Sequence, residues 1–166
     1  QVDPAELAPG QLTTAIRECV ESDGATTIVV DSLNGYLNAM PEERFIGVHL
    51  HELLAYLSQR GVATLLVAAH QGLLGAQMTA PVEATYLVDG VILLRYFESR
   101  GEIRQAISVV KKRGGAHERT IREFRIGRGI EIGEPLRDFQ GVLTGVPVFQ
   151  GTPEALMAIK ENERRG

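Results

Sequence analysis

Two short strand-like runs with a helical pattern between them limit the folds open to this chain. The first run, Thr26 to Asp31, is rich in β-branched residues, and the second covers 62–69. Residues 41–60 between them carry apolar side chains at helical spacing and end at Gly61. Runs of this kind are typical of strands buried on both faces of a parallel sheet. The order of strand, helix and strand therefore predicts an α/β fold.

The pattern changes after residue 90, where strand-like runs follow one another closely. The run 91–96 fits a third strand of the parallel sheet. The runs 103–111 and 120–126 flank a glycine-containing segment, which predicts an antiparallel hairpin over 103–126.

Turn residues become frequent beyond Pro135, which predicts a change in organisation there. We expect a core over 1–134 and a C-terminal arm over 135–166. Less regular patterns predict further short elements, namely helices at 9–22, 82–88 and 153–164 and a strand at 130–132.

Charge and cysteine content narrow the function classes. The net charge is −4, whereas nucleic-acid-binding domains usually carry a basic excess, so we expect no nucleic-acid partner. Cys19 is the single cysteine and has no partner for an internal disulfide, which predicts a cytoplasmic setting. Its place in a helical pattern predicts packing in the core. No apolar run approaches the ~20 residues of a membrane-spanning helix, so no membrane is expected.

Asp31 is the first candidate site residue. It stands at the carboxyl end of a predicted strand, the sheet edge where α/β folds bind ligands. A carboxylate suits magnesium, which prefers hard oxygen ligands. Many α/β strands end in Asp, so an acid that only caps the following loop remains the alternative.

His70 and Gln71 are polar residues after the second apolar run. Side chains there would face the same ligand edge and could sense a phosphate or orient a water. A solvated turn is the alternative.

A basic segment enters the glycine loop of the predicted hairpin. Lys111, Lys112 and Arg113 precede Gly114, and His117 follows it by three positions. Arg and Lys both bind phosphate oxygens, so the loop could present cations to a phosphate. A solvated hairpin tip explains the composition equally well.

One missing motif limits what the chain can do. A phosphate-binding loop reads GxxxxGK followed by Ser or Thr, and the sequence contains no Gly-Lys pair. The backbone amides and the lysine that cradle ATP phosphates are therefore missing.

Together these segments resemble the KaiC-like ATPases of the RecA superfamily over nearly all of residues 1–150. The similar segments are Val30-Asp31-Ser32-Leu33-Asn34-Gly35-Tyr36, which looks like Walker B, then Leu53 to Leu57, Leu93 to Phe97, Ile107 to Arg113 and Gly141 to Pro147. The resemblance implies a RecA-like (P-loop NTPase) α/β core, with a mostly parallel sheet, flanking helices and a C-terminal antiparallel hairpin. That core would be incomplete, because the Walker A strand is missing. We expect a sheet lacking this inner strand to rearrange or to associate through its open edges.

The resemblance also implies roles near a nucleotide. Asp31 matches the Walker B acid that organises Mg²⁺, and Ser32 beside it would lie at the nucleotide. His70 and Gln71 match a catalytic polar site that reads Gln then His in related sequences, so which of them faces the nucleotide stays open.

The basic segment resembles a Lys-x-Arg-Gly-x-x-His hairpin of the family, with Lys111, Arg113 and His117 at its fixed positions. In the family this hairpin reaches the ATP of the neighbouring subunit in a ring, usually a hexamer. The resemblance thus implies ATP as ligand and other copies of the chain as partners, with other signalling proteins also possible.

We expect the chain to be part of a KaiC-like signalling ATPase and to be inactive alone, because it lacks the element that positions ATP. The alternative is a non-catalytic interaction or adaptor module, a pseudo-ATPase that acts through protein association.

Overall fold

The computed structural model describes residues 9–38, 46–69, 86–99, 101–143 and 146–151. These residues fall into two compact units, of which the first ends at Val88 and the second contains the chain from Asp89 onward. In the described part of the chain, no helix has the length and apolar character needed to cross a membrane.

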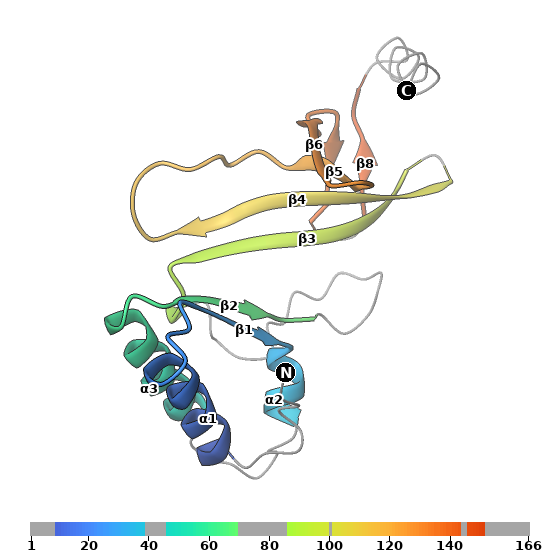
Figure 1. The fold of residues 1–166 in the computed structure, drawn as a ribbon. Helices are drawn as coiled ribbons and strands as arrows, with labels where there is room; N and C mark the ends of the chain where they lie inside the picture. Colours follow the sequence, from blue (N-terminus) through green and yellow to red (C-terminus); the bar gives the residue numbers. More distant parts are fainter. Residues whose placement is uncertain (1–8, 39–45, 70–85, 100, 144–145, 152–166) are drawn as a thin grey trace. The chain divides into compact units, whose positions relative to one another are not determined.

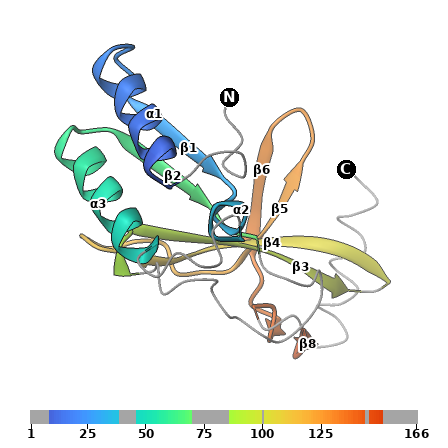
Figure 2. The same ribbon diagram turned by 90° about the horizontal axis from the view of Figure 1, so that it is seen from below.

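The first unit contains the predicted strand–helix–strand arrangement (Figure 1). Its strands β1 and β2 pair in parallel, from Thr27 opposite Ala63 to Asp31 opposite Val67. In both Figure 1 and Figure 2, α1 and α3 lie side by side next to these strands. The elements in chain order are α1 (Pro9–Glu21), β1 (Thr27–Asp31), α2 (Leu33–Asn38), α3 (Ile46–Gln59) and β2 (Ala63–Val67).

The core of this unit lies between the helices and one face of the strands. Leu12 and Ile16 of α1 pack with Leu50, Leu53 and Leu57 of α3 in a single buried cluster. Burying these side chains stabilises the unit, at about 25 cal/mol for each Å² of apolar surface removed from water.

The sequence predicts that these strands are buried on both faces, and this prediction is wrong for the described residues. Burial alternates along β1 and β2, and Val29 and Leu65 remain 60% and 53% exposed. Packing against the core therefore accounts for the apolar residues on one face of these strands and not for those on the other face.

Two further details of the first unit differ from expectation. Cys19 is exposed, so the prediction that it packs in the core is wrong. By spacing, Cys19 would continue the buried stripe of Leu12 and Ile16, but at this end of α1 it is Val20 that packs against the cluster. The short helix α2 was not predicted, because its sequence LNGYLN contains turn-forming residues.

The second unit is built on a four-stranded antiparallel sheet in the order β3-β4-β5-β6. The strands are β3 (Gly90–Ser99), β4 (Glu102–Lys112), β5 (Arg122–Ile126) and β6 (Ile130–Pro135). The predicted hairpin is confirmed, but its paired base is short and runs only from Gln105–Phe124 to Ile107–Arg122.

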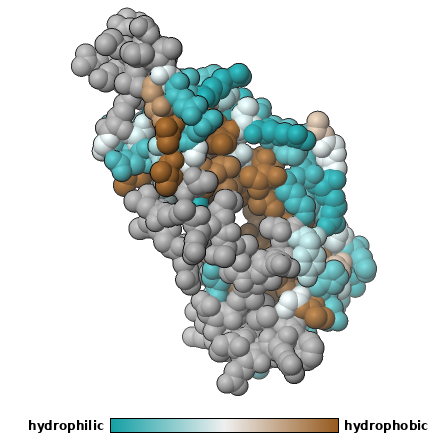
Figure 3. All heavy atoms as spheres, turned by 180° about the vertical axis from the view of Figure 1, so that it is seen from behind, coloured by the Kyte–Doolittle hydropathy of each residue, from teal (hydrophilic) through white to brown (hydrophobic). Residues whose placement is uncertain are grey.

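The expected third parallel strand has a different partner. Among the described residues, β3 pairs antiparallel with β4 along its full length and stands at the edge of the sheet. The turn between them contains Gly101 at φ +77°, a conformation that residues with a Cβ rarely adopt. Ile92 and Leu94 on β3 are 65% and 56% exposed. Figure 3 shows apolar side chains, coloured brown, reaching the surface between hydrophilic ones.

Part of the predicted C-terminal arm packs into this unit. Val142 joins Phe97 and Ala106 in a buried cluster, and Phe139 packs edge to face against Phe97. Arg95 on β3 donates two hydrogen bonds to the carbonyl of Leu143, at 3.0 and 2.8 Å. The short strands β7 (Phe139–Gln140) and β8 (Val148–Phe149) pair antiparallel. The predicted helix 153–164 lies outside the described residues, as does most of the predicted helix 82–88.

Candidate functional site

Asp31 is the last residue of β1 and is exposed, as expected for an acid at a ligand edge. Ser32 follows it and begins the turn into α2. The Oγ atom of Ser32 accepts a hydrogen bond from the backbone N–H of Gly35 at 3.3 Å. This bond satisfies an amide of the first helical turn, so Ser32 serves as a helix cap.

Asn34 holds the ends of the two parallel strands together. Its Nδ2 donates to the carbonyl of Ala69, and its Oδ1 accepts from the amide of Ala69, both at 2.8 Å. The β1–β2 pairing ends at Asp31 and Val67. The side chain of Asn34 therefore extends the connection between the strands beyond their backbone pairing.

His70 and Gln71, the predicted catalytic pair, lie outside the described residues. Their roles and their order remain predictions. The described segment 46–69 ends just before them, at Ala69.

The basic segment lies at the end of β4 and in the loop 113–121 that leads to β5 (Figure 1). Lys111 is half-buried in the strand, Arg113 is exposed at the first loop position, and His117 is half-buried. Gly115 has φ +73°, so the turn after Arg113 uses the freedom of glycine. The end of β4 and this loop thus bring all three predicted phosphate-binding residues into one short segment.

Hydrogen bonds organise the second half of this loop. Glu118 accepts from the backbone N–H of Thr120 at 3.0 Å and lies 3.5 Å from a guanidinium nitrogen of Arg122. The hydrogen bonding with Thr120 holds the pKa of Glu118 below its usual value, and Arg122 adds to the effect. Lys112 reaches the carbonyl of Ala116 at 3.5 Å.

Arg113 contacts Asp89, a residue that the sequence pattern gave no reason to single out. The guanidinium Nη1 lies 3.0 Å from Asp89 Oδ1, and the amide of Arg113 donates to the Asp89 carbonyl at 2.7 Å. No local pattern signals a contact between positions this far apart in the chain.

The residues of the first unit suit a magnesium ion that arrives with a nucleotide. Asp31 contributes one exposed carboxylate, and the described residues contain no group of three or more His, Cys, Asp or Glu that could hold a metal. Mg²⁺ is commonly bound by one or two carboxylates together with phosphates and waters. A single exposed carboxylate such as Asp31 is compatible with this mode of binding.

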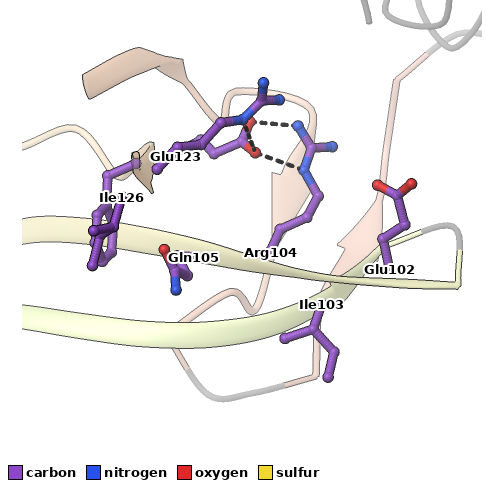
Figure 4. A pocket seen from close by; sticks show the side chains of 8 residues that line it. Glu102, Ile103, Arg104, Gln105, Glu123 and Ile126 are labelled. Carbon is purple, nitrogen blue, oxygen red and sulfur yellow. Dashed lines mark hydrogen bonds and ion pairs between the residues drawn. The ribbon is translucent and has the colours of Figure 1, made fainter. Parts of the chain in front are cut away.

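A pocket of about 470 Å³ lies on β4 and β5 (Figure 4). Arg104 and Glu123 meet in it through two hydrogen bonds, one of them 2.9 Å from Arg104 Nε to Glu123 Oε1. The pair is nearly buried, with side chains 11% and 15% exposed. Since Glu123 already binds Arg104, the pair acts first as a link between two strands.

The two groups of candidate residues belong to different units. Asp31 and Ser32 are in the first unit, and Lys111, Arg113 and His117 are in the second.

A family model, curated relatives and a solved structure all match this chain to the same family. The family model described as "ATPase: KaiC" matches residues 3–137. The chain is 30% identical over 140 residues to circadian clock protein KaiC3 of Synechocystis, covering 84% of this chain and 28% of that protein. It is 32% identical over 125 residues to the circadian clock oscillator protein KaiC of Synechococcus elongatus, covering 72% of this chain and 23% of that protein.

A solved structure agrees with these matches. A KaiC-like protein from the hyperthermophilic archaeon Pyrococcus horikoshii aligns with a TM-score of 0.65 and 25% identity, over 76% of this chain and 54% of that one. The chain therefore spans about a quarter of the curated relatives and about half of the solved structure.

Proposed function

Because the chain belongs to the KaiC ATPase family and has its RecA-type α/β fold, we propose that it forms part of an ATP-binding and ATP-hydrolysing signalling ATPase. In this proposal Asp31 holds Mg²⁺ and Ser32 lies beside the nucleotide. His70 and Gln71 act at the γ-phosphate, where phosphoryl transfer depends on positioning and charge stabilisation. The protein works in a cytoplasmic setting and assembles with other copies of itself, as a ring.

The observation that carries the proposal is the basic loop. Lys111 lies at the end of β4, and Arg113 and His117 follow it in the loop that leads to β5. Cations on a loop with fixed ends can reach an anion outside their own sheet. We propose that this loop contacts the phosphates of ATP held by a neighbouring copy. Charge stabilisation by Arg and Lys suits a phosphate there.

The isolated chain should bind ATP only weakly, because its sequence contains no phosphate-binding loop. Calorimetry with MgATP should detect no binding in the micromolar range. Micromolar binding would contradict the expected inactivity.

The role of the loop has its own test. At millimolar MgATP, NMR shifts should appear at Lys111, Arg113 and His117 and be lost in Arg113→Ala. Asp31→Asn should weaken the magnesium dependence of binding and leave the shifts of the loop with metal-free ATP unchanged. If ATP shifts no signal of the loop in the parent chain, the phosphate role is wrong.

A second candidate function is the non-catalytic adaptor. The exposed apolar residues on the edge strand β3, among them Ile92 and Leu94, favour protein association. Sedimentation and ATP titration separate the two functions. The adaptor predicts association that ATP does not alter and that Arg113→Ala leaves intact, whereas the ATPase predicts association that responds to MgATP at millimolar concentration, where the weak binding is populated.

A further inference from the structure

The fold brings Arg113 and Asp89 together at the open end of the β3–β4 ladder. Asp89 immediately precedes β3, Arg113 immediately follows β4, and Gly90 pairs with Lys112 between them. The antiparallel register therefore places these two residues opposite each other. Their contact is set by the sheet and does not depend on the course of the loop beyond Arg113.

Two contacts join the pair, and they have separate effects. The amide of Arg113 donates to the main-chain carbonyl of Asp89 at 2.7 Å, a bond that any residue at position 89 could accept. The carboxylate of Asp89 contacts the guanidinium at 3.0 Å. Because the main-chain bond already positions the backbone of Arg113, the carboxylate mainly neutralises the charge of the guanidinium.

The ion pair is exposed to solvent and therefore easy to exchange. The side chains of Arg113 and Asp89 are 59% and 76% exposed. Ion pairs at such positions are weak, because water and salt screen them. An incoming anion with more than one negative charge can replace a single carboxylate at the guanidinium, since phosphate and carboxylate oxygens use the same N–H donors.

We propose that Asp89 competes with phosphate oxygens for Arg113 and thereby lowers the affinity of the basic loop for anions that must displace its carboxylate. This inference rests on the proposed phosphate role of the loop. Asp89 acts through Arg113 and sets the affinity of the loop for anions. Its removal strengthens anion binding, whereas removal of a residue that positions Arg113 would weaken it.

The test is an NMR titration of the full chain with inorganic tripolyphosphate at constant ionic strength. Asp89→Asn should tighten binding about 2–5-fold, the range expected for loss of an exposed ion pair. The matched control is Glu131→Gln on β6, which changes net charge equally in an exposed strand position. It should leave the affinity unchanged. Repeating the titration with orthophosphate should show a similar relative gain for Asp89→Asn, because both anions must displace the same carboxylate.

A double variant shows whether the effect passes through Arg113. Arg113→Ala should weaken tripolyphosphate binding, and Asp89→Asn should give no gain in that background. If Arg113→Ala weakens binding while Asp89→Asn does not tighten it, or tightens it no more than Glu131→Gln, competition by Asp89 is refuted and the phosphate role of the loop survives. If Arg113→Ala has no effect, both are refuted. Asp89→Ser serves as a second variant should Asp89→Asn alter the amide spectrum beyond the loop.

Discussion

Replacing Arg104 by methionine should destabilise the second unit by breaking a nearly buried ion pair. Arg104 and Glu123 are 11% and 15% exposed and share two hydrogen bonds. Glu123 stands opposite Ala106 in the β4–β5 register, so the pair ties these strands together at the base of the hairpin. The same base carries the basic loop.

The expected loss in free energy of unfolding depends on the charges and water that remain near Glu123 after Arg104 is replaced. Removing one partner of a buried pair costs about 3–5 kcal/mol, because the other charge is left without compensation. Here Arg125 lies 3.5 Å from Glu123 and its side chain is 63% exposed, so some compensation and some water remain. We therefore expect Arg104→Met to lower the free energy of unfolding by about 2–3 kcal/mol. The double variant Arg104→Met with Glu123→Leu should cost less than about 1 kcal/mol, since both charges are gone.

The measurement is urea denaturation combined with native-state hydrogen exchange, which reports on the second unit separately. Arg128→Met is the matched control, because Arg128 is exposed in the turn before β6 and its loss should change stability by less than about 0.5 kcal/mol. A loss below about 0.5 kcal/mol for Arg104→Met would show that water reaches the pair freely. A double variant as unstable as the single one would show that charge burial is not the cause.

Three further outcomes test other contacts. Leu57→Ala removes a side chain that is 1% exposed and should lower the free energy of unfolding by about 2–5 kcal/mol in urea denaturation; a loss below about 1 kcal/mol would contradict the described core. Asn34→Ala should speed amide hydrogen exchange at Ala69 roughly tenfold, the effect of losing about 1.4 kcal/mol of hydrogen bonding, and unchanged exchange would disprove the link between the strand ends. Because the folded-state pKa of Glu118 is lowered, its stabilising contribution is present above the unfolded value of about 4.3 and is lost as pH falls through the folded value. Glu118→Gln should remove that part of the acid dependence of stability, and identical acid-unfolding curves for variant and parent chain would count against it.

Local sequence patterns were sufficient to locate most elements. The apolar run that ends at Asp31 is β1, the helical pattern before Gly61 is α3, and both strands of the predicted hairpin are present. The resemblance to KaiC-like ATPases was likewise confirmed by the family match over residues 3–137. These inferences succeeded because helical and strand periodicities, and short motifs, are properties of neighbouring residues.

The candidate site was predictable in residue type but not in contacts. The basic loop was found from its composition, whereas Asp89 carried no signal until the β3–β4 register placed it opposite Arg113. The link from Asn34 to Ala69 was hidden for the same reason, because it joins residues 35 positions apart.

The amino-acid sequence was enough to locate most of the helices and strands, to show the resemblance to KaiC-like ATPases, and to show that these 166 residues contain no phosphate-binding motif. Three features became clear only from the folded structure: β3 pairs with β4, Cys19 is exposed, and Arg104 contacts Glu123. The two groups of features differ in the separation along the chain of the residues that produce them. Periodicity arises from the geometry of a single element, whereas strand partners, burial and ion pairs depend on how distant elements pack together.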